Sequence, residues 1–284
     1  MSLTPTVLLV LYCIAIAGFS LVGGLLPNWV KMTHTRTQVA MSLVSGLMLG
    51  VAFYHLLPHS IALLGGAGAT DTSVQWLMLG LITMLLLLRI FHFHQHDFSH
   101  EEEDLHDHQH GHSHGHGQTA QVNSMSWVGI ALGLAVHTLI DGIALGAVMQ
   151  GEMAQGAAGI AGVGVFLAIL LHKPLDAMSI TTIMAAGGWS RSARATYNLL
   201  FALMCPLGAL LFFFGVDFLG DDRDYLVAAA LAFSAGAFIC IALSDLLPEV
   251  HFHSHDRIVL TLAFLLGIGI AYAVGALEPG NLHH

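Results

Sequence analysis

The chain has 284 residues, of which 56% are hydrophobic and only 9% are charged, and its formal net charge is −10. Soluble domains carry roughly 25% charged residues, so this composition excludes an ordinary soluble globular protein. The acidic residues are concentrated in two loops, so the negative charge gives no indication of nucleic-acid binding. A chain of this length accommodates about eight membrane spans of ~20 residues with short connections.

Apolar runs separated by polar or glycine-rich breaks predict eight spans. The first run lacks a basic leader and exceeds the ~7–15 apolar residues of a signal sequence, so we interpret it as a retained span. Lipid offers no partner to a free backbone group, so each span is expected to be helical. The fifth span contains Pro174 and is longer than necessary, which predicts a kink or a tilt. The predicted spans are 6–27, 37–58, 74–92, 125–149, 157–186, 195–216, 225–248 and 257–277.

The basic residues between the spans predict the orientation. Six of them fall on one side of an eight-span zigzag, whereas the other side carries only Arg223, which is surrounded by aspartates. Basic residues are enriched in cytoplasmic connections, so we expect both termini to be extracytoplasmic and the long connection after span three to be cytoplasmic. The six residues are Lys31, Arg36, Arg89, Arg191, Arg194 and Arg257.

A short segment of span two recurs in span seven. Gly46 is followed nine residues later by His-Leu-Leu-Pro-His, which begins at His55. Gly236 is followed at the same distance by Asp-Leu-Leu-Pro-Glu, which begins at Asp245. The two spans run in opposite directions on the predicted topology, and such pairs are typical of inverted repeats in secondary transporters. We therefore expect spans one to three to mirror spans six to eight; the alternative is chance recurrence in a leucine-rich chain.

The connection between spans three and four is rich in histidine. Ten of the 20 histidines lie between His92 and His116, together with six acidic residues. Almost no apolar residue follows Leu105, so the segment cannot build a core and is expected to be disordered. Imidazoles at this density bind zinc, nickel or copper in many arrangements. We expect this loop to buffer, deliver or sense cytosolic metal, and the alternative is a solvated linker. Its candidate ligands are His106, His108, His110, His112, His114 and His116.

Two further histidines lie inside predicted spans, each four residues before an aspartate. His137 precedes Asp141 in span four, and His172 precedes Asp176 in span five. Residues four apart share one face of a helix. Ionisable groups at membrane depth are costly and usually mark a substrate path, whereas a lone histidine often serves only as an interhelical hydrogen-bonding group. Together the pairs offer about four ligands, the number that a divalent transition metal commonly takes. We expect the metal affinity to fall in acid, because protons compete for the ligands.

The whole chain resembles the ZIP (Zrt-/Irt-like) family of divalent-metal transporters, of the prokaryotic type. The resemblance rests on the eight spans, the histidine-rich connection, and the segments His137-Thr-Leu-Ile-Asp-Gly and His172-Lys-Pro-Leu-Asp-Ala. In the family, span four typically reads His-Asn-x-Pro-Asp/Glu-Gly. Span five typically carries a histidine, an acid at the next position, and another acid four residues after the histidine.

The resemblance implies a fold and a site. The fold is an all-α integral membrane protein with eight helices in a 3+2+3 inverted-repeat arrangement, and an elevator-like movement of the bundle that contains spans four and five. The site is the principal transport site, with His137, Asp141, His172 and Asp176 as its metal ligands.

Three residues depart from the family pattern. Thr138 replaces the usual asparagine and Ile140 the usual proline. Lys173 stands where many members have a carboxylate that bridges to a second metal, and an ammonium cannot ligate. We therefore predict one transport metal, with Lys173 and Thr138 as site modulators and Lys173 paired with Asp141 or Asp176. The alternative is a lysine that snorkels to the outer surface.

Four polar residues are predicted at the ends of two spans. His55 and His59 are expected near the outer end of span two, and Asp245 and Glu249 near the inner end of span seven. They are candidate entrance and exit ligands, and the alternative is that they are ordinary polar residues of helix ends.

These features predict a secondary transporter, not an enzyme, that moves a divalent metal into the cytoplasm by alternating access. Zn²⁺ is the expected substrate, with Fe²⁺, Mn²⁺ and Cd²⁺ as further candidates, because selectivity depends on geometry that residue spacing does not give. We expect no permanently bound cofactor and no nucleic-acid partner. The expected location is the plasma (cell inner) membrane as a multi-pass protein, with a homodimer left open.

Two other functions fit some of the same features: cation-diffusion-type metal efflux and a membrane metal sensor. An intramembrane metallohydrolase is disfavoured, because the chain has no His-Glu-x-x-His segment. The predicted organisation has four parts: residues 1–92 with spans one to three, 93–124 with the loop, 125–186 with the metal site, and 187–284 with spans six to eight.

Overall fold

A computed structural model describes residues 4–28, 33–90, 124–154, 161–252 and 257–277 of the chain. All regular structure in these ranges is helical. Eight of the described helical segments are long and apolar enough to cross a membrane, so the predicted number of spans is confirmed. They are Pro5–Leu25, Thr35–Leu64, Ala69–Ile90, Leu132–Met153, Val163–Ala186, Arg191–Phe218, Gly220–Ser244 and Arg257–Ala276.

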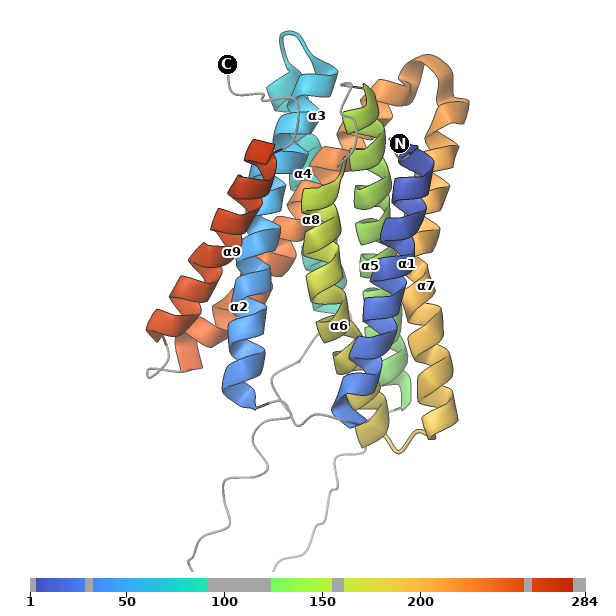
Figure 1. Cartoon of the computed structure of the whole chain (residues 1–284), viewed down its shortest axis with the longest axis vertical. Helices are drawn as coiled ribbons and strands as arrows, with labels where there is room; N and C mark the ends of the chain where they lie inside the picture. Colours follow the sequence, from blue (N-terminus) through green and yellow to red (C-terminus); the bar gives the residue numbers. More distant parts are fainter. Residues whose placement is uncertain (1–3, 29–32, 91–123, 155–160, 253–256, 278–284) are drawn as a thin grey trace, which may run out of the picture.

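The helices follow one another as a bundle of roughly parallel and antiparallel rods (Figure 1). In chain order they are α1 (Pro5–Leu25), α2 (His34–Val51), α3 (Leu57–Leu64), α4 (Ala69–Ile90), α5 (Ser124–Ala154), α6 (Val163–Ala186), α7 (Arg191–Gly215), α8 (Arg223–Phe252) and α9 (Arg257–Leu277). Short 3₁₀ segments follow α1 (η1, Leu26–Asn28) and α7 (η3, Val216–Asp222).

The second span is longer than predicted because it continues through a π-helical turn. This turn, η2 (Ala52–Leu56), joins α2 to α3, and the span ends only at Leu64, before the positive-φ residue Gly65. Single π-helical turns occur frequently at functional sites. The turn carries His55, one of the residues singled out from the sequence.

The kink or tilt predicted from Pro174 stays a prediction. Helix α6 continues through Pro174 from Val163 to Ala186, although proline cannot donate to the helical hydrogen-bond ladder. Gly23 of α1 packs directly on this point: a Cβ at Gly23 would lie 2.3 Å from the Cα of Pro174. The absence of a side chain at Gly23 therefore lets α1 approach the turn of α6 that contains Pro174.

The helices pair in a regular manner. Helix α2 packs against α9 and α4 packs against α8, while α1 packs against α6 and α5 against α7. Glycines allow close backbone approaches in the first two pairs. A Cβ on Gly46 of α2 would lie 2.0 Å from the carbonyl oxygen of Phe264 on α9, and a Cβ on Gly236 of α8 would lie 1.9 Å from that of Leu77 on α4. Small residues let membrane helices pack backbone to backbone in this way.

The centre and the rim of the bundle differ in exposure. The spans around α5 and α8 are mostly buried, whereas α1, α4, α7 and α9 present many exposed apolar side chains on their outer faces. Such faces are expected where a helix meets lipid. The first residues of α1 and the last residues of α9 lie at the same end of the bundle, and the α6–α7 connection lies at the opposite end (Figure 1).

Candidate metal site

Four polar side chains from two adjacent helices meet inside the bundle. Helix α5 contributes His137 and Asp141, and α6 contributes His172 and Asp176; their ligand atoms all lie within 4.8 Å of one another. The first three residues are at most 4% exposed, whereas the side chain of Asp176 is 17% exposed. The spacing of four residues places each pair on one helix face, and the packing of α5 against α6 turns the two faces toward each other.

The two histidines point at the same carboxylate oxygens. Nε2 of His137 lies 3.4 Å from Oδ2 of Asp141 and 3.5 Å from Oδ2 of Asp176. Nε2 of His172 lies 3.1 Å and 3.8 Å from these two oxygens. Two nitrogen and two oxygen ligand atoms therefore surround one point. This donor set suits zinc and also other divalent transition metals.

The backbone fixes the tautomer of His172. Its Nδ1 lies 2.8 Å from the carbonyl oxygen of Ala168, which can only accept a hydrogen bond, so Nδ1 carries the proton. A neutral ring then leaves the lone pair of Nε2 facing Asp141 and Asp176. Metal-binding histidines are commonly oriented in this way by a carbonyl on the far side of the ring.

His137 and Asp141, the two candidate ligands on α5, each have one buried atom without a hydrogen-bond partner among the described residues. These atoms are Nδ1 of His137 and Oδ1 of Asp141. A buried polar atom without a partner costs free energy, so a physical reason is expected for its presence. Oδ1 of Asp141 offers a second ligand oxygen to a cation that enters the cluster.

Lys173 lies within the cluster and does not reach the surface. The residue is only 1% exposed, so the alternative of a snorkelling lysine is wrong. Its Nζ donates to Oδ2 of Asp141, to Oδ2 of Asp176 at 3.0 Å, and to Oγ1 of Thr138 at 3.1 Å. The sequence left open which aspartate it contacts, and the structure has it contacting both. A buried charge is tolerated only when it is paired in this manner.

The charges of the cluster favour a single divalent cation. Two carboxylates and one ammonium give a net charge of −1 when both imidazoles are neutral. One divalent cation changes this to +1, whereas two would leave a strongly positive charge in a low-dielectric interior. Phe201 of α7 adds a weaker contact, since its ring centroid lies 5.6 Å from Nζ of Lys173.

A second group of polar side chains, His55, His59 and Glu152, lies near the connection between α5 and α6. His55 is 1% exposed, and its Nε2 lies 2.9 Å from the carbonyl oxygen of Ala271 on α9. Nδ1 of His59 lies 4.0 Å from Oε1 of Glu152, and Oε2 of Glu152 accepts a hydrogen bond from the backbone of Gly162 at 2.9 Å. None of these three side chains belongs to the four-residue cluster of the described structure.

The sequence analysis did not single out Glu152. The available signal was one acidic residue at the end of an otherwise apolar span, which is costly unless it has partners. The predicted exit residues, Asp245 and Glu249, belong to α8, but their side chains fall outside the described part of the structure. The histidine-rich loop, with His106 to His116, also lies outside the described residues.

The fold and the buried cluster define a multi-pass helical membrane protein with a candidate cation-binding centre between two of its spans. The chain matches the family model described as "ZIP Zinc transporter" over residues 6–275, and it belongs to that family. This is a family of transporters and not of enzymes.

Several named zinc transporters are similar to parts of the chain. Zinc transporter ZIP9 of Micropogonias undulatus is 32% identical over 145 residues, which cover 49% of this chain and 44% of the relative. Zinc transporter foi of Drosophila melanogaster is 31% identical over 164 residues, covering 57% and 21%. Zinc transporter ZIP10 of Danio rerio is 26% identical over 168 residues, covering 56% and 18%. The chain spans less than half the length of these three relatives.

Proposed function

We propose that the chain moves Zn²⁺ across the membrane into the cytoplasm by alternating access, with His137, Asp141, His172 and Asp176 as the transport site. The observation that carries the proposal is the meeting of these four ligands on two adjacent spans, shielded from solvent. The family model and the printed names of the relatives support zinc as the substrate. The same ligands would also accept Fe²⁺, Mn²⁺ or Cd²⁺.

Lys173 gives the proposed site a competing cation of its own. Before an ion enters, its ammonium pairs with both carboxylates and neutralises half of their charge. An entering Zn²⁺ takes over the oxygens of Asp141 and Asp176, while Nζ keeps its hydrogen bond to Thr138. When the ion leaves, the ammonium returns to the carboxylates. Because the ammonium competes for the carboxylates, the exchange lowers the affinity for zinc and favours its release, which a carrier requires. The ammonium also leaves room for one metal only.

The pairing of the helices supports an inverted repeat of the 3+2+3 type. If spans one to three mirror spans six to eight, the contact of α2 with α9 corresponds to that of α8 with α4, and both occur. The close approach of Gly46 to α9 corresponds in the same way to that of Gly236 to α4. These two glycines are the ones that precede the recurring Leu-Leu-Pro segments. The contact of α1 with α6 likewise corresponds to that of α7 with α5.

The orientation and setting are part of the proposal. Both termini face the extracytoplasmic side, and residues 93–124 form a cytoplasmic loop between the parts 1–92 and 125–186; residues 187–284 complete the bundle. The distribution of arginine and lysine supports this orientation. We further propose a carrier of the prokaryotic type in the cell inner membrane, with a second copy of the chain as a candidate partner.

The polar group near the α5–α6 connection lies on the proposed entrance side. His59 and Glu152 would receive the ion there, and His55 lies against the start of α6, since a Cβ on Gly164 would lie 2.7 Å from its ring. Asp245 and Glu249 are the proposed exit ligands on the opposite side.

Zinc influx into liposomes tests the function. The purified chain is reconstituted with an internal zinc-sensitive dye, and influx is compared between wild type and the His172→Ala/Asp176→Ala variant. We expect influx in the wild type and a loss of at least about tenfold in the variant. The Asp71→Asn variant is the matched control, because it removes an exposed acid of α4 far from the site in the sequence. Equal influx in wild type and site variant would refute the proposed site, and the absence of influx in wild type would favour a sensor.

A further inference from the structure

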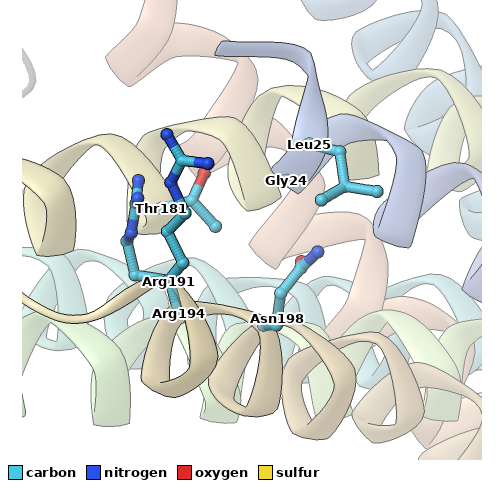
Figure 2. A pocket seen from close by; sticks show the side chains of 7 residues that line it. Gly24, Leu25, Thr181, Arg191, Arg194 and Asn198 are labelled. Carbon is cyan, nitrogen blue, oxygen red and sulfur yellow. The ribbon is translucent and has the colours of Figure 1, made fainter. Parts of the chain in front are cut away.

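A cavity of about 370 Å³ lies at the end of the bundle where α6 is joined to α7. Helix α1 contributes Gly24 and Leu25, and α6 contributes Thr181, whereas the first two turns of α7 contribute the remaining side chains (Figure 2). The side chains from α7 are Arg191, Arg194, Ala195 and Asn198. A water molecule occupies about 30 Å³ in the liquid, so the cavity accommodates a considerably larger group.

The lining of this cavity is positively charged. Two guanidinium groups reach it, and none of its described lining residues is acidic. None of the ion pairs within the described residues involves Arg191 or Arg194. The start of α7 adds the partial positive charge of a helix N-terminus. A passing Zn²⁺ would be repelled here, so the cavity is not suited to be an exit for the metal. An anion would be attracted.

Two buried polar atoms at the cavity have no partner in the described structure. They are Nε of Arg194, which donates, and Oδ1 of Asn198, which accepts. Asn198 is only 3% exposed, and its Nδ2 donates to the carbonyl oxygen of Leu21 at 3.1 Å, which fixes the orientation of the amide. A Cβ on Gly24 would lie 2.3 Å from this Nδ2, so the glycine lets the amide reach α1.

These atoms describe the chemistry of the missing partner. A guanidinium donates in a planar fork that matches phosphate oxygens. The free Oδ1 of Asn198 requires a donor, which a hydroxyl supplies. The ligand that satisfies both is a phosphate that also carries a hydroxyl, either on the phosphate itself or on an attached glycerol.

The surroundings of the cavity point to a lipid as the source of this phosphate. The ring of Trp189, in the α6–α7 connection, packs edge-on against that of Tyr197 at a centroid distance of 5.7 Å. Tryptophan and tyrosine gather at the depth of lipid headgroups. Farther along α7, Leu199, Leu203 and Leu207 are each 47% exposed or more, which provides an apolar surface for an acyl chain.

We propose that the cavity between α1, α6 and α7 binds the phosphoglycerol headgroup of an anionic membrane lipid through Arg191, Arg194 and Asn198. The bound headgroup joins α1 and α7 to α6, the helix that carries His172 and Asp176. The proposal rests on this cavity alone and stands whether or not the chain transports zinc.

Lipid retention by the full-length chain tests the proposal. The protein is purified in a neutral detergent and titrated with phosphatidylglycerol, phosphatidylcholine, glycerol phosphate or inorganic phosphate. Bound lipid is counted by native mass spectrometry, and the unfolding midpoint is followed in parallel. We expect one tightly retained phosphatidylglycerol and a rise in the midpoint, whereas phosphatidylcholine has little effect. Equal retention of the two lipids would overturn the assignment of an anionic headgroup. A midpoint that rises with inorganic phosphate but not with phosphatidylglycerol would overturn the lipid as its source.

Three variants make the test specific. Arg191→Gln/Arg194→Gln is expected to weaken phosphatidylglycerol retention by at least about tenfold. Arg36→Gln/Arg257→Gln removes the same charge from two exposed arginines outside the cavity and is expected to retain the lipid. Asn198→Asp introduces a negative charge at nearly unchanged volume and is expected to lose the lipid even if the double variant folds poorly. Unchanged retention in a folded cavity variant would refute the proposal.

Discussion

Lys173 of α6 and Asp141 of α5 form an ion pair in which the two side chains are only 1% and 0% exposed. The same oxygen of Asp141 lies 3.1 Å from Nε2 of His172. The ammonium of Lys173 and the imidazole of His172, a proposed metal ligand, thus contact the same carboxylate oxygen. We therefore expect a substitution at position 173 to change the zinc affinity, the number of bound metals and the stability, which the first two predictions address.

Replacing Lys173 by methionine removes the charge and keeps a side chain of similar length. We expect Lys173→Met to bind Zn²⁺ about tenfold more tightly, which corresponds to about 1.4 kcal/mol, and to transport it more slowly because release becomes harder. Without zinc the variant should be destabilised by about 3–5 kcal/mol, since a buried carboxylate loses its partner. Zinc titration by calorimetry and thermal unfolding with and without a chelator measure both effects. Lys173→Arg keeps the charge and is the control; an unchanged zinc affinity in Lys173→Met would contradict the exchange.

Replacing the same lysine by glutamate should change the number of bound metals. We expect one tightly bound zinc in a chain that lacks residues 95–120 and two after Lys173→Glu is added, because a carboxylate ligates where an ammonium cannot. Removal of the loop excludes zinc held by its histidines. Elemental analysis after desalting gives the ratio of zinc to protein. Two tightly held ions in the chain that retains Lys173 would show the single-metal prediction to be wrong.

Deletion of residues 95–120 should leave zinc influx largely intact. The segment contains eight of the ten histidines of the loop. Its composition predicts no fixed geometry, and ligands without a fixed geometry do not select an ion. Liposomes with an internal zinc dye measure the influx, and replacement of the segment by a glycine–serine linker of equal length is the control. Abolished transport in both versions would mean that the loop takes part in translocation.

Two glycines of α9 provide a matched test of the helix packing. A Cβ on Gly267 would lie 2.1 Å from the carbonyl oxygen of Leu43 on α2, whereas a Cβ on Gly269 would have no atom within 4 Å. We expect Gly267→Ala to lower the free energy of unfolding by about 1–3 kcal/mol, because α2 and α9 must move apart. Gly269→Ala should leave it unchanged or raise it slightly. Thermal unfolding in detergent compares the two, and equal midpoints would argue against this backbone contact.

Much of the fold could be read from local patterns. Hydropathy predicted the number of spans because each apolar run is a local property of the chain. The ends were less accurate: the second span extends to Leu64 instead of residue 58, and the fifth begins at Val163 instead of residue 157. A hydropathy pattern does not indicate the π-helical turn or the glycines at which a span begins or ends.

The sequence by itself determined the two ligand pairs, because His137 with Asp141 and His172 with Asp176 need only the period of a helix to share a face. Their meeting depends on the rotation and packing of α5 against α6, which are set by contacts between distant segments. The α5–α6 packing also decided that Lys173 lies against both aspartates, whereas the meeting of Glu152 with His59 depends on the packing of α5 against α3. The packing of α1, α6 and α7 formed the arginine-lined cavity. These contacts depend on which helices pack together and how closely their backbones approach at glycines. The local periodicity of the sequence does not contain this information.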